Sequence, residues 1–233
     1  MTEALSNTAN HLEPTAHAVN HHEQTFWELA ATKAPDENMH YYLNCTIVAC
    51  AMYILLHFAI HEIALRCFRE YREDMDLRKR VEYRTYLISP VHALLSVILS
   101  LTAMFWICGE GKTVFNDDHC FNTPRYIHIW ALLNTCGYFI QDFFWIAFIV
   151  QGTTSLDYQT YAHHIIGALT FYQTLYFMDF MVVFGVMLLF TEISTIFVSI
   201  RWILYKHNYG DTMAYNVNGI IAFFTFLVFR LVY

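Results

Sequence analysis

The sequence predicts an all-α membrane protein, a bundle of about six transmembrane helices around a polar cavity in the cytoplasmic half. Two observations predict the bundle. Apolar residues make up 57% of the 233-residue chain and charged residues only 14%, whereas a soluble domain carries about 25% charge. The apolar residues are also gathered into runs of about 20 residues, the length of helix that crosses roughly 30 Å of hydrocarbon.

The predicted spans are joined by short loops, as expected of a compact bundle. They cover residues 43–66, 85–108, 128–150, 158–177, 180–200 and 213–233. Residues 41–233 therefore form one membrane domain. Residues 1–40 form a polar, acidic, histidine-rich tail without the features of a signal peptide. We expect this tail to be disordered, and metal capture by His17, His21 and His22 is the alternative for it.

Basic residues predict which end of each span faces the cytosol. The loop after the first span is rich in them, and the loop after the fifth holds Lys206, whereas the opposite side has only Lys33, Lys112 and Arg125. By the positive-inside rule the first, third and fifth loops are cytoplasmic and the N-terminal tail is lumenal or extracellular. Binding of anionic headgroups is the alternative for the basic loop, which runs to Arg84. The acids of the same loop argue against a strong lipid-binding patch: Glu70, Glu73, Asp74, Asp76 and Glu82. A disulfide between Cys108 and Cys120, which flank one loop, fits if that loop is lumenal.

Ionisable residues inside spans cost about 2.5 to 3.5 kcal/mol each at the bilayer centre, so they are seldom idle. The predicted spans contain His57, His61, His92, Asp142, His163, His164 and Glu192. Five of them lie roughly 8 to 14 Å from the cytoplasmic ends of their spans, at a rise of about 1.5 Å per residue: His57, His92, Asp142, His163 and Glu192. Antiparallel helices have no local reason to agree on depth. The agreement predicts a shared polar chamber in the cytoplasmic half.

Polar and small residues also share helix faces, because residues three and four apart lie on one side of a helix. The predicted stripes are Thr46, Cys50, Tyr53, His57 and His61; Ser89, His92, Ser96 and Ser100; Asn134, Tyr138, Gln141 and Asp142; His163, Gly167, Thr170 and Thr174; and Glu192, Thr195 and Ser199. Taken singly, each histidine is more often a hydrogen-bonded packing residue than a catalyst or ligand. Taken together, they favour a functional chamber.

Several motifs then occur in a familiar order. They are SPVHALLS at 89–96, GYFIQD at 137–142, YAHHIIG at 161–167, TEISTIFVSIRW at 191–202 and NGIIAFFTFLVFR at 218–230. Together they resemble the TLC domain, which is shared by ceramide synthases, translocation-associated membrane proteins and smaller lipid-homeostasis proteins. The resemblance covers residues 81–233 and is greatest to the TLC domain-containing protein 4 group, formerly called transmembrane protein 56.

The resemblance implies a helical bundle around a cavity open to the membrane, usually in the endoplasmic reticulum. It also implies that the chain is a fragment or a form without the last helix, because relatives continue beyond the final arginine-containing helix. His163 and His164 match the paired histidine in the active site of ceramide synthases. Past that pair the chain departs from those enzymes, because residues 171–192 contain no histidine and their acids are only Asp179 and Glu192.

Lipid handling is the function that the sequence favours. Such a protein binds, senses or transports a lipid whose headgroup contacts His92, Asp142, His163, Glu192 and His57, because a headgroup in a dry bundle needs charged or hydrogen-bonding partners. Membrane lipid is the expected partner, and neither nucleic acid nor a cofactor is expected.

Enzymatic and metal-binding functions are the alternatives. If the chain is an enzyme, it is an acyltransferase of the ceramide synthase type with His163, His164 and Glu192 as catalytic residues; a non-enzymatic role is favoured. An intramembrane metal site built from the same histidines and carboxylates is disfavoured, because neighbouring histidines point about 100° apart on a helix. No metal ligand is therefore assigned.

Overall fold

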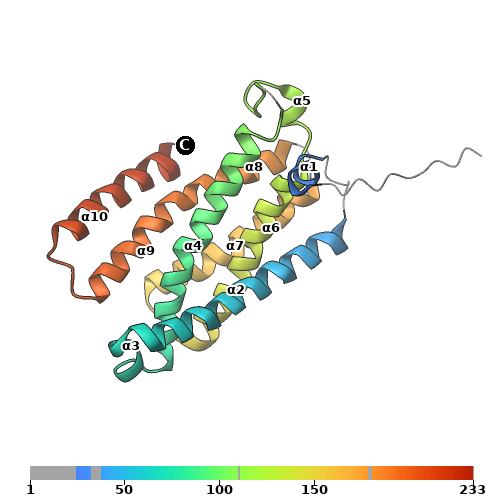
Figure 1. The fold of residues 1–233 in the computed structure, drawn as a ribbon. Helices are drawn as coiled ribbons and strands as arrows, with labels where there is room; N and C mark the ends of the chain where they lie inside the picture. The colour runs from blue at the N-terminus through green and yellow to red at the C-terminus, as the bar shows by residue number, and fades with distance from the viewer. Residues whose placement is uncertain (1–24, 33–37, 110, 178–179, 233) are drawn as a thin grey trace, which may run out of the picture.

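The computed structural model describes residues 25–32, 38–109, 111–177 and 180–232, and the regular elements in these ranges are all helical. The α-helices are α1 (Phe26–Ala31), α2 (Met39–Cys67), α3 (Arg69–Glu73), α4 (Leu77–Phe105), α5 (Asp118–Phe121), α6 (Tyr126–Trp145), α7 (Ser155–Phe177), α8 (Phe180–Leu188), α9 (Ile193–Lys206) and α10 (Met213–Phe226). Two π-helices, η1 (Ile146–Val150) and η3 (Leu227–Val232), extend α6 and α10, and the 3-10 helix η2 (Leu189–Glu192) joins α8 to α9. The long helices form one bundle (Figure 1), so the predicted all-α membrane fold is confirmed.

Five helical segments are long and apolar enough to cross a membrane within the described ranges. They are Met39–Cys67, Leu77–Phe105, Tyr126–Val150, Met181–Lys206 and Met213–Leu231. The chain is therefore a multi-pass membrane protein. The predicted fourth span corresponds to α7, which has 23 residues and is more polar than the other segments, as its sequence indicates.

The second span begins earlier than hydropathy predicts. The prediction places its start at residue 85, whereas α4 begins at Leu77. The Asp76 side chain accepts a hydrogen bond from the Lys79 backbone N–H at 2.9 Å and so caps the helix there. The first turns of α4 are charged, but they bury Val81, Tyr83 and Arg84. Tertiary packing therefore extends this helix beyond its apolar run.

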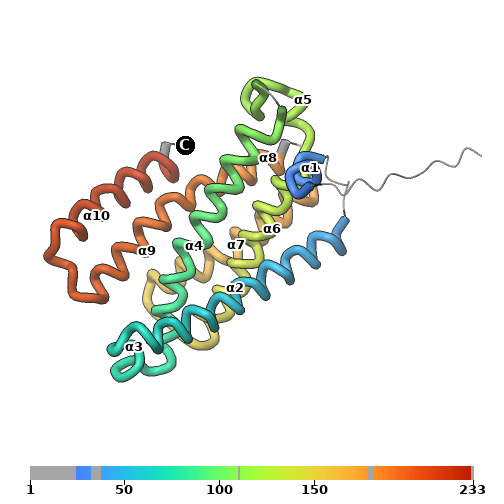
Figure 2. Tube along the Cα trace, in the orientation of Figure 1, coloured from blue at the N-terminus to red at the C-terminus, as the bar shows by residue number. Residues whose placement is uncertain are grey.

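Helix α4 lies in the middle of the bundle, where it contacts α2, α6, α9 and η2. Helices α2, α6 and α7 pack together on one side of it, and α9 and α10 form an antiparallel hairpin on the other (Figure 2). Two side-chain bonds hold this hairpin: Asn218 Nδ2 donates to Phe197 O at 2.8 Å, and Arg201 Nη1 donates to Tyr215 O at 3.2 Å. Because α10 packs mainly on α9, most of its apolar surface faces outward.

The loops of the bundle divide between two ends, as the predicted alternation requires. Helix α3 and the turn from α9 to α10 lie at one end, and α1 and α5 lie at the other (Figure 1). The two basic loops of the sequence therefore share an end. At the opposite end a disulfide joins Cys108 and Cys120, whose Cα atoms are 5.8 Å apart, so that predicted pairing is confirmed.

The prediction of a disordered tail over residues 1–40 is wrong for residues 25–32. Thr25 and Glu28 form a capping box that starts α1. The Phe26 ring stacks on Trp130 of α6 at a centroid distance of 5.3 Å, and Ala30 is fully buried. Aromatic packing against α6 therefore orders this segment. His17, His21 and His22 lie outside the described residues.

Candidate functional site

Two adjacent histidines of α7 meet two different carboxylates. His164 Nε2 lies 3.1 Å from Asp142 Oδ2 of α6, and both side chains are 6% exposed. His163 Nε2 lies 4.0 Å from Glu192 Oε1 of η2, with the histidine 47% exposed and the glutamate 6% exposed. This split follows from the 100° turn between neighbouring positions on a helix. The pair of His164 and Asp142 is therefore buried, whereas the pair of His163 and Glu192 has a longer distance and an exposed histidine.

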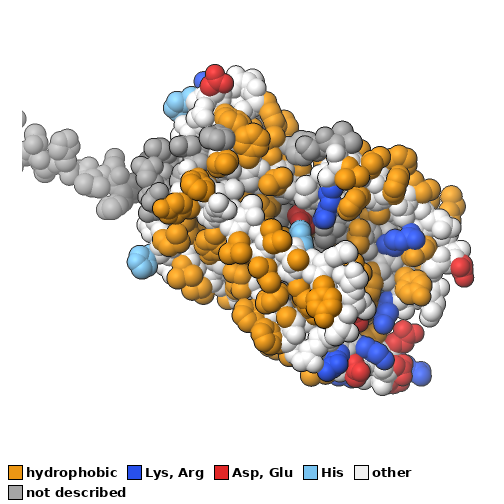
Figure 3. All heavy atoms as spheres, turned by 180° about the vertical axis from the view of Figure 1, so that it is seen from behind, with side chains coloured by type: hydrophobic (Ala, Val, Ile, Leu, Met, Phe, Trp, Pro, Cys, Tyr) orange, Lys and Arg blue, Asp and Glu red, His pale blue; other side chains and the backbone are white. Residues whose placement is uncertain are grey.

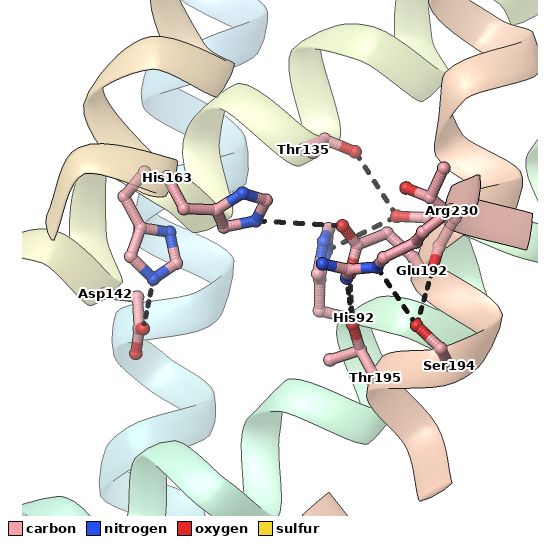
Figure 4. A network of polar contacts seen from close by, with 11 residues as sticks. His92, Thr135, Asp142, His163, Glu192, Ser194, Thr195 and Arg230 are labelled. Carbon is pink, nitrogen blue, oxygen red and sulfur yellow. Dashed lines mark hydrogen bonds and ion pairs between the residues drawn. The ribbon is translucent and has the colours of Figure 1, made fainter. Parts of the chain in front are cut away.

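The Glu192 carboxylate belongs to a wider charged cluster that includes an arginine from the end of the chain. Thr195 Oγ1 donates to Glu192 Oε2 at 2.8 Å. Arg230, in the π-helix η3, donates from Nε to Ser194 Oγ at 3.1 Å and from Nη2 to Thr195 Oγ1 at 3.2 Å. Figure 4 shows the His163 ring directed toward Glu192, with Ser194, Thr195 and Arg230 gathered around that carboxylate.

Sequence reasoning missed Arg230 as a site residue. The available signal was an arginine inside the last apolar run, which is rare unless it is paired or functional. Glu192 also ends the 3-10 segment η2 between α8 and α9, and short 3-10 and π segments within helices often mark functional sites. Glu192 and Arg230 therefore both lie in segments where the regular α-helix is interrupted.

His92 joins the site through aromatic and hydroxyl groups rather than through a carboxylate. Its ring is fully buried and stacks on Tyr138 at a centroid distance of 3.9 Å. Nδ1 lies 3.2 Å from the Tyr53 hydroxyl and 3.4 Å from the Ser96 hydroxyl. The Tyr138 ring in turn makes an edge contact with His164 at 6.0 Å. The side chains of this site come from α4, α6, α7 and η2. We call them the chamber residues, after the predicted chamber: His92, Asp142, His163, His164 and Glu192.

His57 makes no hydrogen bond to this network. It is fully buried, its ring packs on Trp145 at a centroid distance of 4.9 Å, and neither ring nitrogen has a hydrogen-bond partner among the described residues. Equal depth in the sequence therefore did not give His57 a hydrogen bond to the chamber residues, although the Asp142 carboxylate is a charged neighbour of its ring. The rotation of α2 about its own axis, which the depth of a residue in the membrane does not determine, brings the His57 ring against Trp145.

The buried face of α7 also differs from its predicted stripe. The helix buries His164, Phe171 and Leu175, whereas the sequence pattern favoured His163, Thr170 and Thr174. His163 consequently sits at the edge of the packed interface. In Figure 3 apolar side chains dominate the molecular face, and a histidine, an acidic and a basic side chain lie together in a hollow near its middle.

Several buried polar atoms of the site have unused hydrogen-bonding capacity. His92 Nε2, Asp142 Oδ1 and His164 Nδ1 have no hydrogen-bond partner among the residues that the structure describes. Buried polar atoms in native proteins rarely lack a hydrogen-bond partner from the protein or from ordered water. In the described part of the chain, no group of three or more His, Cys, Asp or Glu side chains is arranged to hold a metal ion. The side chains of the site offer hydrogen bonding, ion pairing and proton exchange.

Comparisons with known proteins agree with this architecture. The family model of the TLC domain matches residues 82–233. TLC domain-containing protein 1 from Mus musculus is 24% identical over 173 residues, which are 74% of this chain and 66% of that protein. The Homo sapiens protein of the same name is 30% identical over 97 residues, which are 42% of this chain and 38% of that protein.

The Rattus norvegicus protein is 29% identical over 149 residues, 64% of this chain and 57% of that protein. The matched part of the chain thus spans less than two thirds of the length of each of these relatives. No solved structure matches the chain. The relatives are TLC domain-containing protein 1 rather than protein 4, so the predicted likeness to the protein 4 group stays a prediction. The motifs, the bundle and the matched family model lead to one conclusion: the chain belongs to the TLC domain family.

Proposed function

We propose that the protein is a membrane lipid-handling protein that binds the polar headgroup of a lipid between α7 and α9. The observation that carries this proposal is the half-open pair of His163 and Glu192. Glu192 is held by Thr195, yet its Oε1 is 4.0 Å from a histidine that is 47% exposed. Charged groups in a membrane bundle need strong partners. A headgroup entering beside His163 supplies them.

The cluster offers both donors and acceptors to such a headgroup. Arg230 contributes a permanent cation, Glu192 contributes an acceptor, and His163 contributes either, depending on its protonation. A lipid with a polar headgroup and apolar tails is the amphiphile that can enter from the bilayer. His92, Asp142 and His164 lie behind this entrance as a buried polar wall with unused hydrogen-bonding capacity. The proposal therefore gives them a supporting role and gives His57 none.

Lipid that co-purifies with the protein tests this proposal. We expect wild-type protein in mild detergent to retain a defined lipid class, and His163→Ala and Glu192→Gln to retain about tenfold less, because each removes a charge-assisted contact. The matched control is His119→Ala, which removes an exposed histidine of α5. Mass spectrometry of the extracted lipids measures the change. A lipid profile in wild type equal to that of the solubilised membrane, or an unchanged profile in both variants, contradicts the proposal.

Acyl transfer is the second candidate, favoured by the approach of the Glu192 carboxylate to His163. A carboxylate that orients a histidine is typical of general-base catalysis. His163, the more open histidine, would take the proton of an amine or hydroxyl as that atom attacks the thioester carbonyl of an acyl-CoA. The C–S bond then breaks, and the protonated His163 gives its proton to the departing thiolate, which leaves as the free thiol. Incubation with acyl-CoA and a long-chain base or lysolipid tests this, and the absence of product above the His163→Ala level rules out that reaction.

We also propose that the N-terminal tail is lumenal and that the protein resides in the endoplasmic reticulum. Two independent features support the orientation. The basic loops share one end of the bundle, the end that the positive-inside rule assigns to the cytosol. The Cys108–Cys120 disulfide lies at the other end, and disulfides persist in oxidising compartments such as the lumen.

A further inference from the structure

A cavity that none of the chamber residues lines is found at the basic end of the bundle. Its volume is about 470 Å³, and it is lined by Phe58, His61, Met75, Asp76, Leu77, Arg80, Arg84 and Trp145. Two of these residues are arginines and one is an acid, so the cavity has an excess of positive charge. The acid, Asp76, is already engaged as the N-cap of α4.

The positive charge of Arg84 is unusual because its side chain is buried. The residue is only 5% exposed, and its Nε has no hydrogen-bond partner among the described residues. No described carboxylate forms an ion pair with it, and its guanidinium carbon lies 5.6 Å from the centre of the Trp145 ring. A buried cation without an anionic partner is costly. An anion in the cavity would provide the missing partner.

An apolar groove continues from this cavity along α2. It has a volume of about 440 Å³ and is lined by Cys50, Ile54, Ile140, Gln141, Phe144, Trp145, Phe148 and Ile149. Trp145 lines both spaces. On α2, Cys50, Ile54, Phe58 and His61 follow one another at steps of four, four and three residues, so they lie along one face. The cavity and the groove therefore meet at Trp145 and follow the same face of α2, and we call the two together the α2–α6 seam.

The two parts of the seam are chemically complementary to the two parts of an anionic phospholipid. Its basic end fits a phosphate, and its apolar part fits an acyl chain. Gln141 lies in that apolar part with both amide atoms unpartnered among the described residues and only 3% exposed, so it can bond an ester group. We propose that the α2–α6 seam binds an anionic phospholipid, with the phosphate on Arg84 and Arg80 and one acyl chain passing Trp145.

Lipid titration monitored by native mass spectrometry tests this site. The probes are phosphatidylglycerol, phosphatidylcholine and inorganic phosphate, each added to delipidated full-length protein. We expect wild type to bind phosphatidylglycerol about tenfold more tightly than phosphatidylcholine, and Arg84→Gln to lose that preference. Millimolar phosphate is expected not to displace the lipid. Displacement by phosphate, or an unchanged preference in Arg84→Gln, overturns the proposal.

A second variant tests the apolar part of the seam and remains informative if Arg84→Gln does not fold. Ile54→Trp fills the groove from a position that is 38% exposed, and we expect it to weaken binding of both lipids. Two controls are matched to these changes. Arg78→Gln removes an exposed arginine that bonds Gln151, and Ile47→Trp changes an exposed residue of α2 outside the groove. Wild-type binding by Ile54→Trp overturns the proposal, as does equal weakening by Ile47→Trp.

The seam is separable from the proposed function. In this titration we expect His163→Ala to keep the preference for phosphatidylglycerol over phosphatidylcholine, even though it binds less lipid in total, because His163 lies on α7 and does not line the seam. If His163→Ala loses the preference for phosphatidylglycerol over phosphatidylcholine, the titrated lipid binds at the chamber residues. That result would overturn the proposed lipid site in the seam.

Discussion

Asp142→Ala is expected to lower the free energy of unfolding by about 3 to 5 kcal/mol, the usual cost of removing one partner from a buried ion pair. The change leaves the His164 ring buried at 6% exposure without its acceptor 3.1 Å away. Asp142→Asn keeps an oxygen acceptor at that position, so we expect a smaller loss. Denaturant titration of the purified protein in mixed micelles measures both values.

The matched control for this change is Asp211→Ala, in the exposed turn between α9 and α10. Surface substitutions of this kind usually stay within about 0.5 kcal/mol of wild type. A double-mutant cycle with His164→Leu measures the coupling directly. Equal stability of Asp142→Ala and Asp211→Ala, or additive effects of Asp142→Ala and His164→Leu, contradicts a buried pair.

Gly137→Ala is expected to destabilise the protein by about 1 to 3 kcal/mol, the usual cost of overpacking. Gly137 lies where α6 crosses α2, and an added Cβ would meet the Cys50 backbone nitrogen at 2.9 Å and the Thr46 carbonyl oxygen at 3.0 Å. Backbone atoms cannot rotate away, so the two helices must separate. The contact between Cys50 Sγ and Gly137 O, 3.2 Å long, is then lost.

Gly185→Ala provides the comparison, because Gly185 is also helical and buried against neighbours. Its added Cβ would meet side-chain atoms of Leu132 and Thr174 at 3.2 Å, and these can shift. Alanine also favours a helix over glycine by about 1 kcal/mol, so we expect this variant to be close to neutral. Thermal unfolding of both variants in the same detergent gives the order. A Gly137→Ala protein as stable as Gly185→Ala contradicts the close crossing of α2 and α6.

The sequence predicted the long helices well because membrane spans depend on length and apolarity, which are local properties. From depth and helical spacing it predicted that His57, His92, Asp142, His163 and Glu192 line one chamber, and that depth argument did not include His164. It did not predict which histidine pairs with which carboxylate, because that depends on the rotation of α7 against α6. It also did not predict that the His57 ring packs on Trp145 and makes no hydrogen bond to the chamber residues.

Three further features depended on tertiary packing. Arg230 reaches Ser194 and Thr195 only because α10 folds back onto α9 and ends in a π-helix. Helix α1 forms because Phe26 packs against Trp130, a residue more than a hundred positions away in the sequence. Charged residues such as Arg84 looked like a topology signal, although the structure buries that arginine beside Trp145. None of these contacts has a signature within a short sequence window.

The central claim is that a lipid headgroup enters between α7 and α9, and localised photocrosslinking tests it most directly. A lipid with a photoreactive group beside its headgroup is activated in native membranes, and the labelled peptides are mapped. The account predicts labels enriched on residues flanking His163 and on the start of α9, and their loss in His163→Ala. Labels spread evenly over outward-facing helices such as α10, or labels on α7 and α9 that persist in His163→Ala, would contradict it.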